Sequence, residues 1–186
     1  MRIEEIADDG ILQALMASMH DPNRSPGLHL SDITGDISKQ LDPKRFSGEM
    51  NPALLAAGNA FETVIARQLR LMFPGADKPG EFSSDGIAMS PDFLNPVYGC
   101  PEEDKMTWTS GRLGLDHPKL ERYHRQGKSY CRVLGTDRIL FRVLFVNGSY
   151  DTYLPVLRTF LVTYSTRELR ENWEMILQHG EDMGVL

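Results

Sequence analysis

The sequence predicts an α/β domain in which a central, mixed β-sheet is flanked by α-helices. The chain has 186 residues, 41% of them hydrophobic and 25% charged, which suits one globular domain with a sizeable core. Helical and extended patterns follow one another as helices, a strand cluster, a helix, two strands and a helix. This order is typical of helices layered on a sheet. The nearly all-apolar run over 139–146 is typical of a central strand covered on both faces.

A short appendage is expected to precede the domain. Residues 3–18 place apolar side chains along one side of a short amphipathic helix. The stretch 20–27 contains two prolines, an asparagine and a glycine, and predicts a loop. We therefore divide the chain into an N-terminal helix and loop, 1–28, and a compact domain, 29–186.

Two helices are expected to open the domain. Apolar side chains recur at helical spacing over 29–41 and predict the first helix. The second is expected over 52–72, because Pro52 suits a first helical turn and Pro74 follows the end of the pattern.

Short extended segments are expected next. The stretch 80–95 is rich in turn-forming residues, with brief extended pieces around 81–83 and 86–89. A mixture of β-forming residues at 106–109 predicts a further strand.

The last part of the chain is expected to complete the sheet and its helical cover. A helix is predicted over 118–134 from its single apolar stripe, and the strand at 139–146 is interrupted only by Arg142. A further strand is predicted over 159–164. Ser165 and Glu168 have the spacing of a capping box, which predicts a C-terminal helix that continues through Gln178.

Charge and cysteine content exclude some classes of protein. The chain carries 20 Lys and Arg against 26 Asp and Glu, a formal net charge of −6. This excludes histone-like proteins that bind nucleic acid through bulk positive charge, but not an enzyme with a local basic groove beside metal-binding carboxylates. The two cysteines, Cys100 and Cys131, are too few for a four-cysteine zinc site or iron–sulfur cluster.

Several function classes lack their signatures in this sequence. No Gly-rich phosphate loop and no GxxxxGK[ST] occurs, so a doubly wound nucleotide-binding fold is not expected. The histidines show no HExxH spacing, and no serine lies in a G-x-S-x-G elbow. No signal pattern is present, and no apolar run approaches the roughly 20 residues of a membrane span. We expect a cytoplasmic protein with reduced thiols and no membrane partner.

Two carboxylates stand out among apolar or turn-forming neighbours. Glu62 lies at the edge of the apolar stripe of the helix over 52–72, where a carboxylate needs a cation or a hydrogen-bond donor. A boundary glutamate that reaches water is the alternative. Asp92 follows Pro91, and an aspartate that initiates a turn is the alternative there. Taken singly, each residue is better explained by its structural alternative.

A charged run contains the third candidate group. Glu103 and Lys105 are two residues apart, so on a strand their side chains point to the same side. Asp92 and Glu103 together can hold a hard divalent cation, with water completing its coordination. Lys105 beside them can orient or help deprotonate an attacking water, as metal-assisted phosphodiester hydrolysis requires. A solvated charge run is the alternative.

Gln126 and Tyr130 form the fourth candidate group. Residues four apart on a helix lie side by side. Tyr130 falls on the apolar stripe, so its ring is expected to be buried and its hydroxyl directed at a polar group. The alternative is a core tyrosine with an incidental glutamine.

Taken together, these groups resemble one family of enzymes. Their order along the chain is Gly58-x-x-x-Glu62 on a helix, Ser90-Pro91-Asp92, Glu103-x-Lys105, and Gln126-x-x-x-Tyr130 on a helix. This ordered set resembles the PD-(D/E)XK nuclease superfamily, in particular its RecB-like and lambda-exonuclease-like, or phage-type, branch. The resemblance covers roughly residues 29–165 and implies a restriction-endonuclease-like central mixed β-sheet flanked by α-helices.

The resemblance also implies roles for individual residues. Glu62 would contribute to a metal site from the N-terminal helix, and Asp92 and Glu103 would be the main ligands of Mg²⁺ or Mn²⁺. The carbonyl of Asp104 would add a third oxygen, and Lys105 would position or activate the attacking water.

The helical Gln-x-x-x-Tyr pair has a counterpart in the family as well. By resemblance, Gln126 and Tyr130 would orient the active site and the DNA backbone.

The sequence departs from the family pattern around the Glu-x-Lys motif. Asp104 stands where the family usually has an apolar residue, and Cys100-Pro101-Glu102 precedes the motif. Glu102 therefore competes with Glu103 as the ligand, although only Glu103 shares a face with Lys105. The alternative implied by this departure is an active site with weakened catalysis.

Several residues are candidates for contact with nucleic acid. Trp108 can stack on an unpaired base, with a core or boundary tryptophan as the alternative. Thr109 and Ser110 can donate to phosphate oxygens but are also ordinary strand residues. The helix over 118–134 is basic and can meet phosphates, with a solvated face as the alternative. Its basic residues are Lys119, Arg122, Arg125, Lys128 and Arg132.

We therefore expect a metal-dependent deoxyribonuclease, and an exonuclease in preference to an endonuclease, that acts on DNA in recombination or DNA processing. A structure- or sequence-specific endonuclease is the first alternative. A catalytically inactive nuclease-like subunit that binds DNA or protein is the second. By resemblance, the setting is a bacterial or phage-infected cell. A recombination or replication protein partner and a homo-oligomeric ring both remain open.

Overall fold

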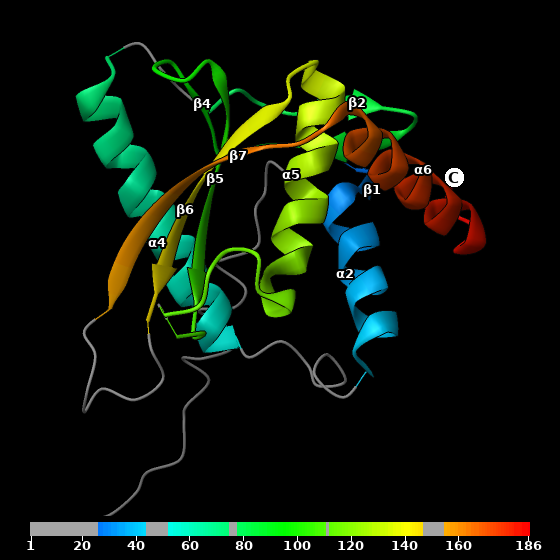
Figure 1. Ribbon diagram of the computed structural model, residues 1–186, viewed down its shortest axis with the longest axis horizontal. Helices are drawn as coiled ribbons and strands as arrows, with labels where there is room; N and C mark the ends of the chain where they lie inside the picture. The colour runs from blue at the N-terminus through cyan, green and yellow to red at the C-terminus, as the bar shows by residue number, and fades with distance from the viewer. Residues whose placement is uncertain (1–25, 44–51, 75–77, 111, 147–154) are drawn as a thin grey trace, which may run out of the picture.

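The computed structural model describes residues 26–43, 52–74, 78–110, 112–146 and 155–186 (Figure 1). The helix expected over 3–18 and most of the preceding appendage lie outside the described residues. Within the described residues, no helix is both long enough and apolar enough to cross a membrane.

The centre of the fold is a four-stranded mixed sheet, as predicted. Its strands lie in the order β4, β5, β6 and β7. The two inner strands run parallel to each other, and each pairs antiparallel with its outer neighbour. The bounds are Phe93–Asn95 for β4, Cys100–Thr107 for β5, Arg138–Phe145 for β6 and Val156–Thr163 for β7.

A second, smaller sheet was not predicted as a separate unit. It consists of β1 (Leu28–His29), β3 (Ile87–Met89) and β2 (Phe82–Ser84), in that order. The hairpin between β2 and β3 turns at Asp85 and Gly86, which both have positive φ, of 52° and 77°. An Asp-Gly pair adopts this left-handed conformation readily, so the turn residues fix the hairpin register.

In the part of the chain that the structure describes, five helical segments surround the sheets. They are α2 (Leu30–Leu41), α4 (Pro52–Met72), the short 3₁₀ helix η1 (Pro118–Leu120), α5 (Glu121–Leu134) and α6 (Thr166–Asp182). Helix α5 connects the parallel strands β5 and β6 and packs between the four-stranded sheet and the pair α2 and α6 (Figure 1). Helix α4 contacts β5. The predicted capping box is confirmed, because Ser165 and Glu168 exchange hydrogen bonds at the start of α6.

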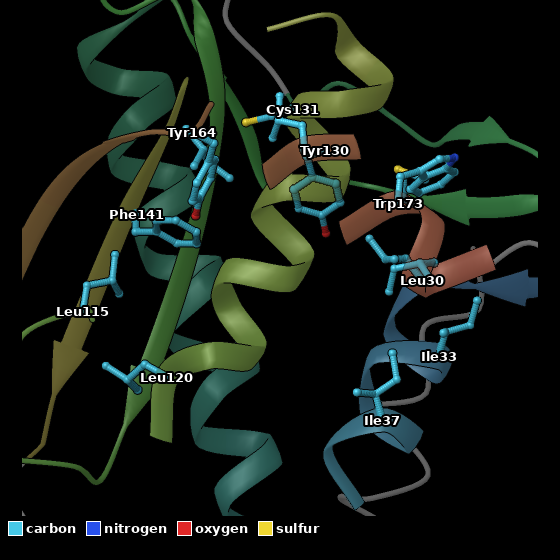
Figure 2. Close-up of a cluster of buried hydrophobic side chains, with 14 of the residues drawn as sticks. Leu30, Ile33, Ile37, Leu115, Leu120, Tyr130, Cys131, Phe141, Tyr164 and Trp173 are labelled. Atoms are coloured by element: carbon cyan, nitrogen blue, oxygen red, sulfur yellow. The ribbon is translucent and has the colours of Figure 1, made fainter. Parts of the chain in front are cut away.

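The core forms where α5 lies against β6 (Figure 2). The side chains of Ile139, Phe141, Val143 and Phe145 alternate along β6 and are completely buried on this side. Gly127 permits the close packing, since a Cβ atom there would lie 2.6 Å from Phe141 Cζ. Packing in the core therefore sets the distance between α5 and the sheet.

The opposite face of the sheet is only partly covered. Leu140 is buried there, but Leu157 and Leu161 of β7 are 46% and 44% exposed. On this face Leu140 and Val146 are buried while Arg142 and Leu144 are partly exposed, so the expectation that the strand at 139–146 is covered on both faces holds in part.

Strand β5 is longer than predicted and includes the whole charged run. The β-forming residues at 106–109 predicted only the end of this strand, although the shared face expected of Glu103 and Lys105 already required an extended backbone there. Pro101 is the second residue of the strand, where it lies opposite Leu94 of the short outer strand β4. The charged side chains that follow alternate between the two faces of the sheet and find partners on each face.

Candidate active site

Asp92 is held beside β5 by two backbone contacts. Its own N–H donates to the carbonyl of Glu102 at 3.1 Å. Its Oδ2 accepts the N–H of Asp104 at 2.9 Å. The carboxylate of Asp92 thus continues the β4–β5 ladder where β4 begins, and it is positioned by the sheet rather than by a free loop.

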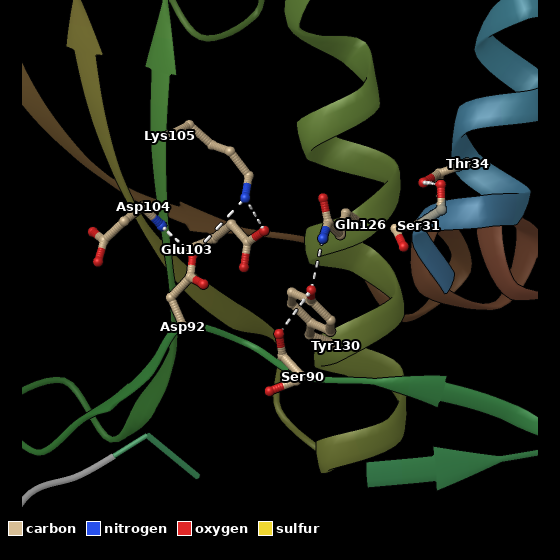
Figure 3. Close-up of polar contacts among 9 residues, drawn as sticks. All are labelled: Ser31, Thr34, Ser90, Asp92, Glu103, Asp104, Lys105, Gln126 and Tyr130. Atoms are coloured by element: carbon tan, nitrogen blue, oxygen red, sulfur yellow. Dashed lines mark hydrogen bonds and ion pairs between the residues drawn. The ribbon is translucent and has the colours of Figure 1, made fainter. Parts of the chain in front are cut away.

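Glu103 and Lys105 lie on the face of β5 that looks toward α5, as their spacing predicts (Figure 3). Lys105 Nζ forms an ion pair with Glu103 Oε1 and lies 3.8 Å from Asp92 Oδ2. The side chains of Asp92 and Lys105 are only 16% and 18% exposed. Two carboxylates and one ammonium therefore meet in a largely buried cluster.

The carboxyl group of Glu103 is held in an environment that opposes its charge. Burial, followed by the neighbouring charge of Asp92, raises its pKa to about 8, although Lys105 acts in the opposite direction. Its Oε2 atom is buried and accepts no hydrogen bond. An oxygen in this position is costly to bury unless a cation or a donor approaches it.

Lys105 is held in its cationic form. Burial alone would lower its pKa, but the charges of Glu103, Asp92 and Glu62 raise the pKa well above its ordinary value. An ammonium in this state can position water or phosphate oxygens but is a poor proton acceptor. Of the two roles considered for Lys105, orientation fits the geometry better than deprotonation.

Glu62 reaches the same cluster from helix α4. It lines a cavity of about 400 Å³ together with Asp92, Arg70 and Lys78. Burial raises its pKa, the charge of Lys105 lowers it, and the charge of Asp92 raises it. The expected convergence of the helical glutamate with the strand carboxylates is therefore present.

Gln126 and Tyr130 lie side by side on α5 and face the site (Figure 3). Gln126 Nε2 donates to the hydroxyl of Tyr130 at 2.7 Å, and that hydroxyl donates to the carbonyl of Ser90 at 3.3 Å. The tyrosine ring is buried, as expected. This chain of bonds ties α5 to the segment that carries Asp92.

The opposite face of β5 carries a separate polar network. Glu102 is completely buried, forms an ion pair with Arg142 of β6, and accepts a bond from Asn95 Nδ2 at 2.6 Å. The structure therefore resolves the competition between the two glutamates: Glu102 is neutralised away from Lys105, and Glu103 faces it.

Asp104 points its side chain to the face of Glu102 and not into the cluster (Figure 3). It is 1% exposed, its Oδ1 accepts no hydrogen bond, and burial followed by the charge of Glu102 raises its pKa to about 8. Only backbone atoms of Asp104 lie on the Asp92 side, so its carboxylate is not a ligand candidate in this arrangement.

The carboxylate oxygens at this site suit a hard divalent cation whose remaining coordination positions are filled by water and phosphate oxygens. Among the residues that the structure describes, no three His, Cys, Asp or Glu side chains form a closed metal-binding group. Asp92 and Glu103 supply two carboxylates, and the unbonded Oε2 of Glu103 has the chemistry of a ligand. Mg²⁺ is commonly held by one or two carboxylates with water and substrate phosphates. Zn²⁺ prefers nitrogen and sulfur ligands that this site lacks.

The predicted nucleic-acid contacts next to the site lie on exposed loop surface. Trp108 follows β5 directly and is 40% exposed. Thr109 bonds to Thr107 through both its backbone N–H and its hydroxyl, and Ser110 accepts the N–H of Arg112. Trp108 therefore keeps an accessible ring, whereas the two hydroxyl side chains are engaged in shaping the loop.

The basic residues of α5 have different surroundings. Arg125 is buried, and its guanidinium donates to Ser38 of α2 at 3.3 Å, so it braces two helices. Arg122 lies near Gly35 of α2, and the ammonium of Lys128 lies 5.5 Å from the ring centre of Tyr164. Burial of Arg125 between two helices argues against a phosphate contact by that residue. The phosphate contacts expected of the other basic residues stay predictions.

Arg132 and Lys119 lie outside the lining of the two cavities beside the carboxylate cluster. Arg132 is exposed near the C-terminal end of α5, and Lys119 lies in η1 before the helix.

Some site residues were not found from the sequence. Lys78 and Arg70 line the cavity beside Glu62 and Asp92, and no local pattern marked them. Arg142 had a signal, since a lone charge in an apolar strand needs a buried counter-charge. The interrupted strand therefore signals a buried counter-charge, and the structure shows that Glu102 supplies it.

The fold resembles those of solved nucleases. The alkaline exonuclease LHK-Exo from Laribacter hongkongensis aligns with a TM-score of 0.57 and 17% identity over 92% of each chain. A phage-related exonuclease from Haemophilus somnus 129PT gives a TM-score of 0.51 and 12% identity over 82% of this chain and 78% of its own. No protein-family model matches the sequence, and comparison with curated proteins finds no relative. The likeness confirms the predicted nuclease fold, and at these identities it shows the fold alone.

Proposed function

We propose that this protein is a metal-dependent deoxyribonuclease, and specifically an exonuclease. The observation that carries the proposal is the meeting of Asp92, Glu103 and Lys105 on one face of β5, with an unbonded carboxylate oxygen among them. Buried like charges are costly, so a cluster of this kind is a candidate functional site. The likeness of the fold to exonucleases supports the same reaction class.

The carboxylates and the lysine would have different roles. Asp92 and Glu103, aided by Glu62, would hold Mg²⁺ or Mn²⁺. When bound, the ion would act as a Lewis acid toward the scissile phosphate. Lys105, held cationic, would orient the attacking water and offset negative charge on the phosphate.

Tyr130 and Gln126 would keep this geometry fixed. Tyr130 binds the Ser90 carbonyl two residues before Asp92, so it would hold the loop that presents the carboxylate. Gln126 would keep the tyrosine hydroxyl oriented through its own bond. Rigid support of this kind preserves catalytic distances.

The biological setting follows from the same resemblance. We propose DNA as the substrate and recombination or DNA processing as the context. A recombination or replication protein as partner, and assembly into a homo-oligomer, belong to this proposal.

The test uses the purified protein with Mg²⁺ or Mn²⁺ and two substrates, linear duplex DNA and closed circular DNA. Asp92→Asn and Lys105→Ala are expected to reduce cleavage by at least 100-fold, an order of magnitude typical of lost electrostatic groups. Asp182→Asn, at the exposed end of α6, is the matched control and should cleave normally. EDTA should stop the reaction.

The outcomes separate the candidate functions. Degradation of linear DNA alone supports the exonuclease, whereas nicking of circular DNA favours an endonuclease. Wild-type rates in Asp92→Asn would overturn the assigned site. Absence of cleavage with either metal would favour the inactive binding subunit.

A further inference from the structure

Lys78 lies where two cavities meet at the carboxylate cluster. It lines the cavity of about 400 Å³ that contains Glu62 and Asp92. It also lines a second cavity of about 570 Å³ that contains Gln126, Tyr130 and Ser90. Both volumes fall in the range of about 300–1,000 Å³ that suits a small organic ligand or part of a larger one. Lys78 is the residue that these two cavities share.

The segment that carries Asp92 contributes a residue to each cavity. Ser90 lines the second cavity, and Asp92, two residues later, lines the first. Any polymer held in both cavities would therefore cross this segment next to Asp92. A substrate cut beside Asp92 would then have units on both sides of the reacting bond.

The charge of Lys78 suits a phosphate at this crossing point. Its side chain is exposed. Burial raises the pKa of the nearby Glu62, and the positive charge of Lys78 offsets a small part of that rise. A lysine ammonium is a compact point charge with three donors and binds phosphate without a strict geometric requirement. It would also offset repulsion between a polyanion and the carboxylates that surround the crossing.

We infer that one nucleic-acid strand occupies both cavities during the reaction, and that Lys78 binds the backbone phosphate between the two occupied subsites. The inference rests on the proposed nuclease function and names a substrate-positioning residue for it. Lys78 would bind this phosphate equally in the ground state and in the transition state.

The test measures binding without turnover. A fluorescein-labelled single-stranded oligonucleotide is titrated in the presence of Ca²⁺ in place of Mg²⁺, and anisotropy is followed between 0.05 and 1 M salt, conditions that span strong and weak screening (about 14 Å to 3 Å). Loss of one phosphate contact lowers the slope of log K against log salt by about 0.7 for a single strand. That slope change corresponds to about fourfold weaker binding at 0.15 M salt relative to 1 M.

Three variants make the test specific. Lys78→Gln should show the smaller slope, and Lys78→Arg should retain the wild-type slope because it keeps the charge. Lys39→Gln is the matched control, since Lys39 is an exposed lysine on α2 that lines neither cavity. In a cleavage assay, Lys78→Gln should raise KM by a similar factor and leave kcat nearly unchanged, as expected for uniform binding.

The result distinguishes failure of the Lys78 inference from failure of the proposed nuclease function. If the wild type cleaves DNA but Lys78→Gln has the same salt slope and KM as Lys39→Gln, the inference is wrong and the nuclease proposal stands. If the wild type neither binds nor cleaves DNA, both are overturned. A fall in kcat of Lys78→Gln with unchanged KM would also refute the assigned positioning role.

Discussion

Replacing Glu103 with glutamine tests the electrostatic account of the site without relying on activity. In the fold, burial and the charge of Asp92 raise the pKa of Glu103 to about 8 from its ordinary value of 4.5. The folded state therefore holds a proton that the unfolded chain releases between these two values. The contribution of this group to stability is fully present below pH 4.5 and is lost as the pH rises through about 8.

The slope of this loss can be worked out. Between pH 4.5 and 8, one proton held only by the folded state costs about 1.4 kcal/mol per pH unit. Across the whole window the loss approaches about 5 kcal/mol, which is a large share of the stability of a domain. Asp104, with a pKa also raised to about 8, should add a second, similar slope.

The assay is urea unfolding in EDTA at pH 5.5, 6.5 and 7.5, followed by circular dichroism. The wild type should lose stability at each step, and Glu103→Gln should lose about 1.4 kcal/mol less per unit. Asp104→Asn should remove its own share independently. Mg²⁺ should restore stability to the wild type at pH 7.5, because an ion that binds only the folded state stabilises it.

Two results would refute this reasoning. Equal pH slopes in the wild type and Glu103→Gln would show that Glu103 is already ionised in the metal-free fold. A slope of opposite sign, with stability rising toward pH 7.5, would show that Lys105 outweighs burial. Glu171→Gln, an exposed position on α6, controls for a general effect of removing charge.

Three further predictions concern packing and hydrogen bonding, each measured by urea unfolding at pH 6. Arg142→Met leaves Glu102 buried without its cation and should cost about 3–5 kcal/mol, and adding Glu102→Gln should recover much of the loss; a cost below 1 kcal/mol would contradict the buried pair. Gly127→Ala places a methyl group against Phe141 and should cost about 1–3 kcal/mol; unchanged stability would mean that α5 shifts freely. Tyr130→Phe removes the hydroxyl bonds and should cost about 1 kcal/mol, with a larger loss of cleavage than of stability; normal cleavage would deny it a positioning role.

Much of the fold could be predicted because local patterns dominate there. The helices now seen as α2 and α4 were predicted within one residue, since apolar spacing and a flanking proline mark their ends. The capping box at Ser165 is a purely local device and was likewise predictable. The start of β5 at Cys100 was not predicted from β-forming residues, because proline and charged residues are depleted in strands, although the spacing of Glu103 and Lys105 required an extended backbone there.

The sequence predicted which site residues share a face of one helix or strand, but not which residues of different elements contact one another. Spacing alone placed Glu103 and Lys105 on one side of a strand, and Gln126 beside Tyr130 on a helix. The basic residues of α5 showed the limit of this reasoning. Composition could not reveal that Arg125 would be buried against Ser38.

The sequence by itself determined the fold class, the type and order of most elements, and which acidic side chain shares a face with Lys105. These properties depend on periodicity and capping within a few residues. Only the tertiary structure decided which carboxylates meet, which lysine lies between the cavities, and that Glu102 is neutralised by Arg142 on the far face. The pair of Glu102 and Arg142, for example, joins residues 40 positions apart in the chain, and the low-dielectric interior makes such contacts energetically decisive.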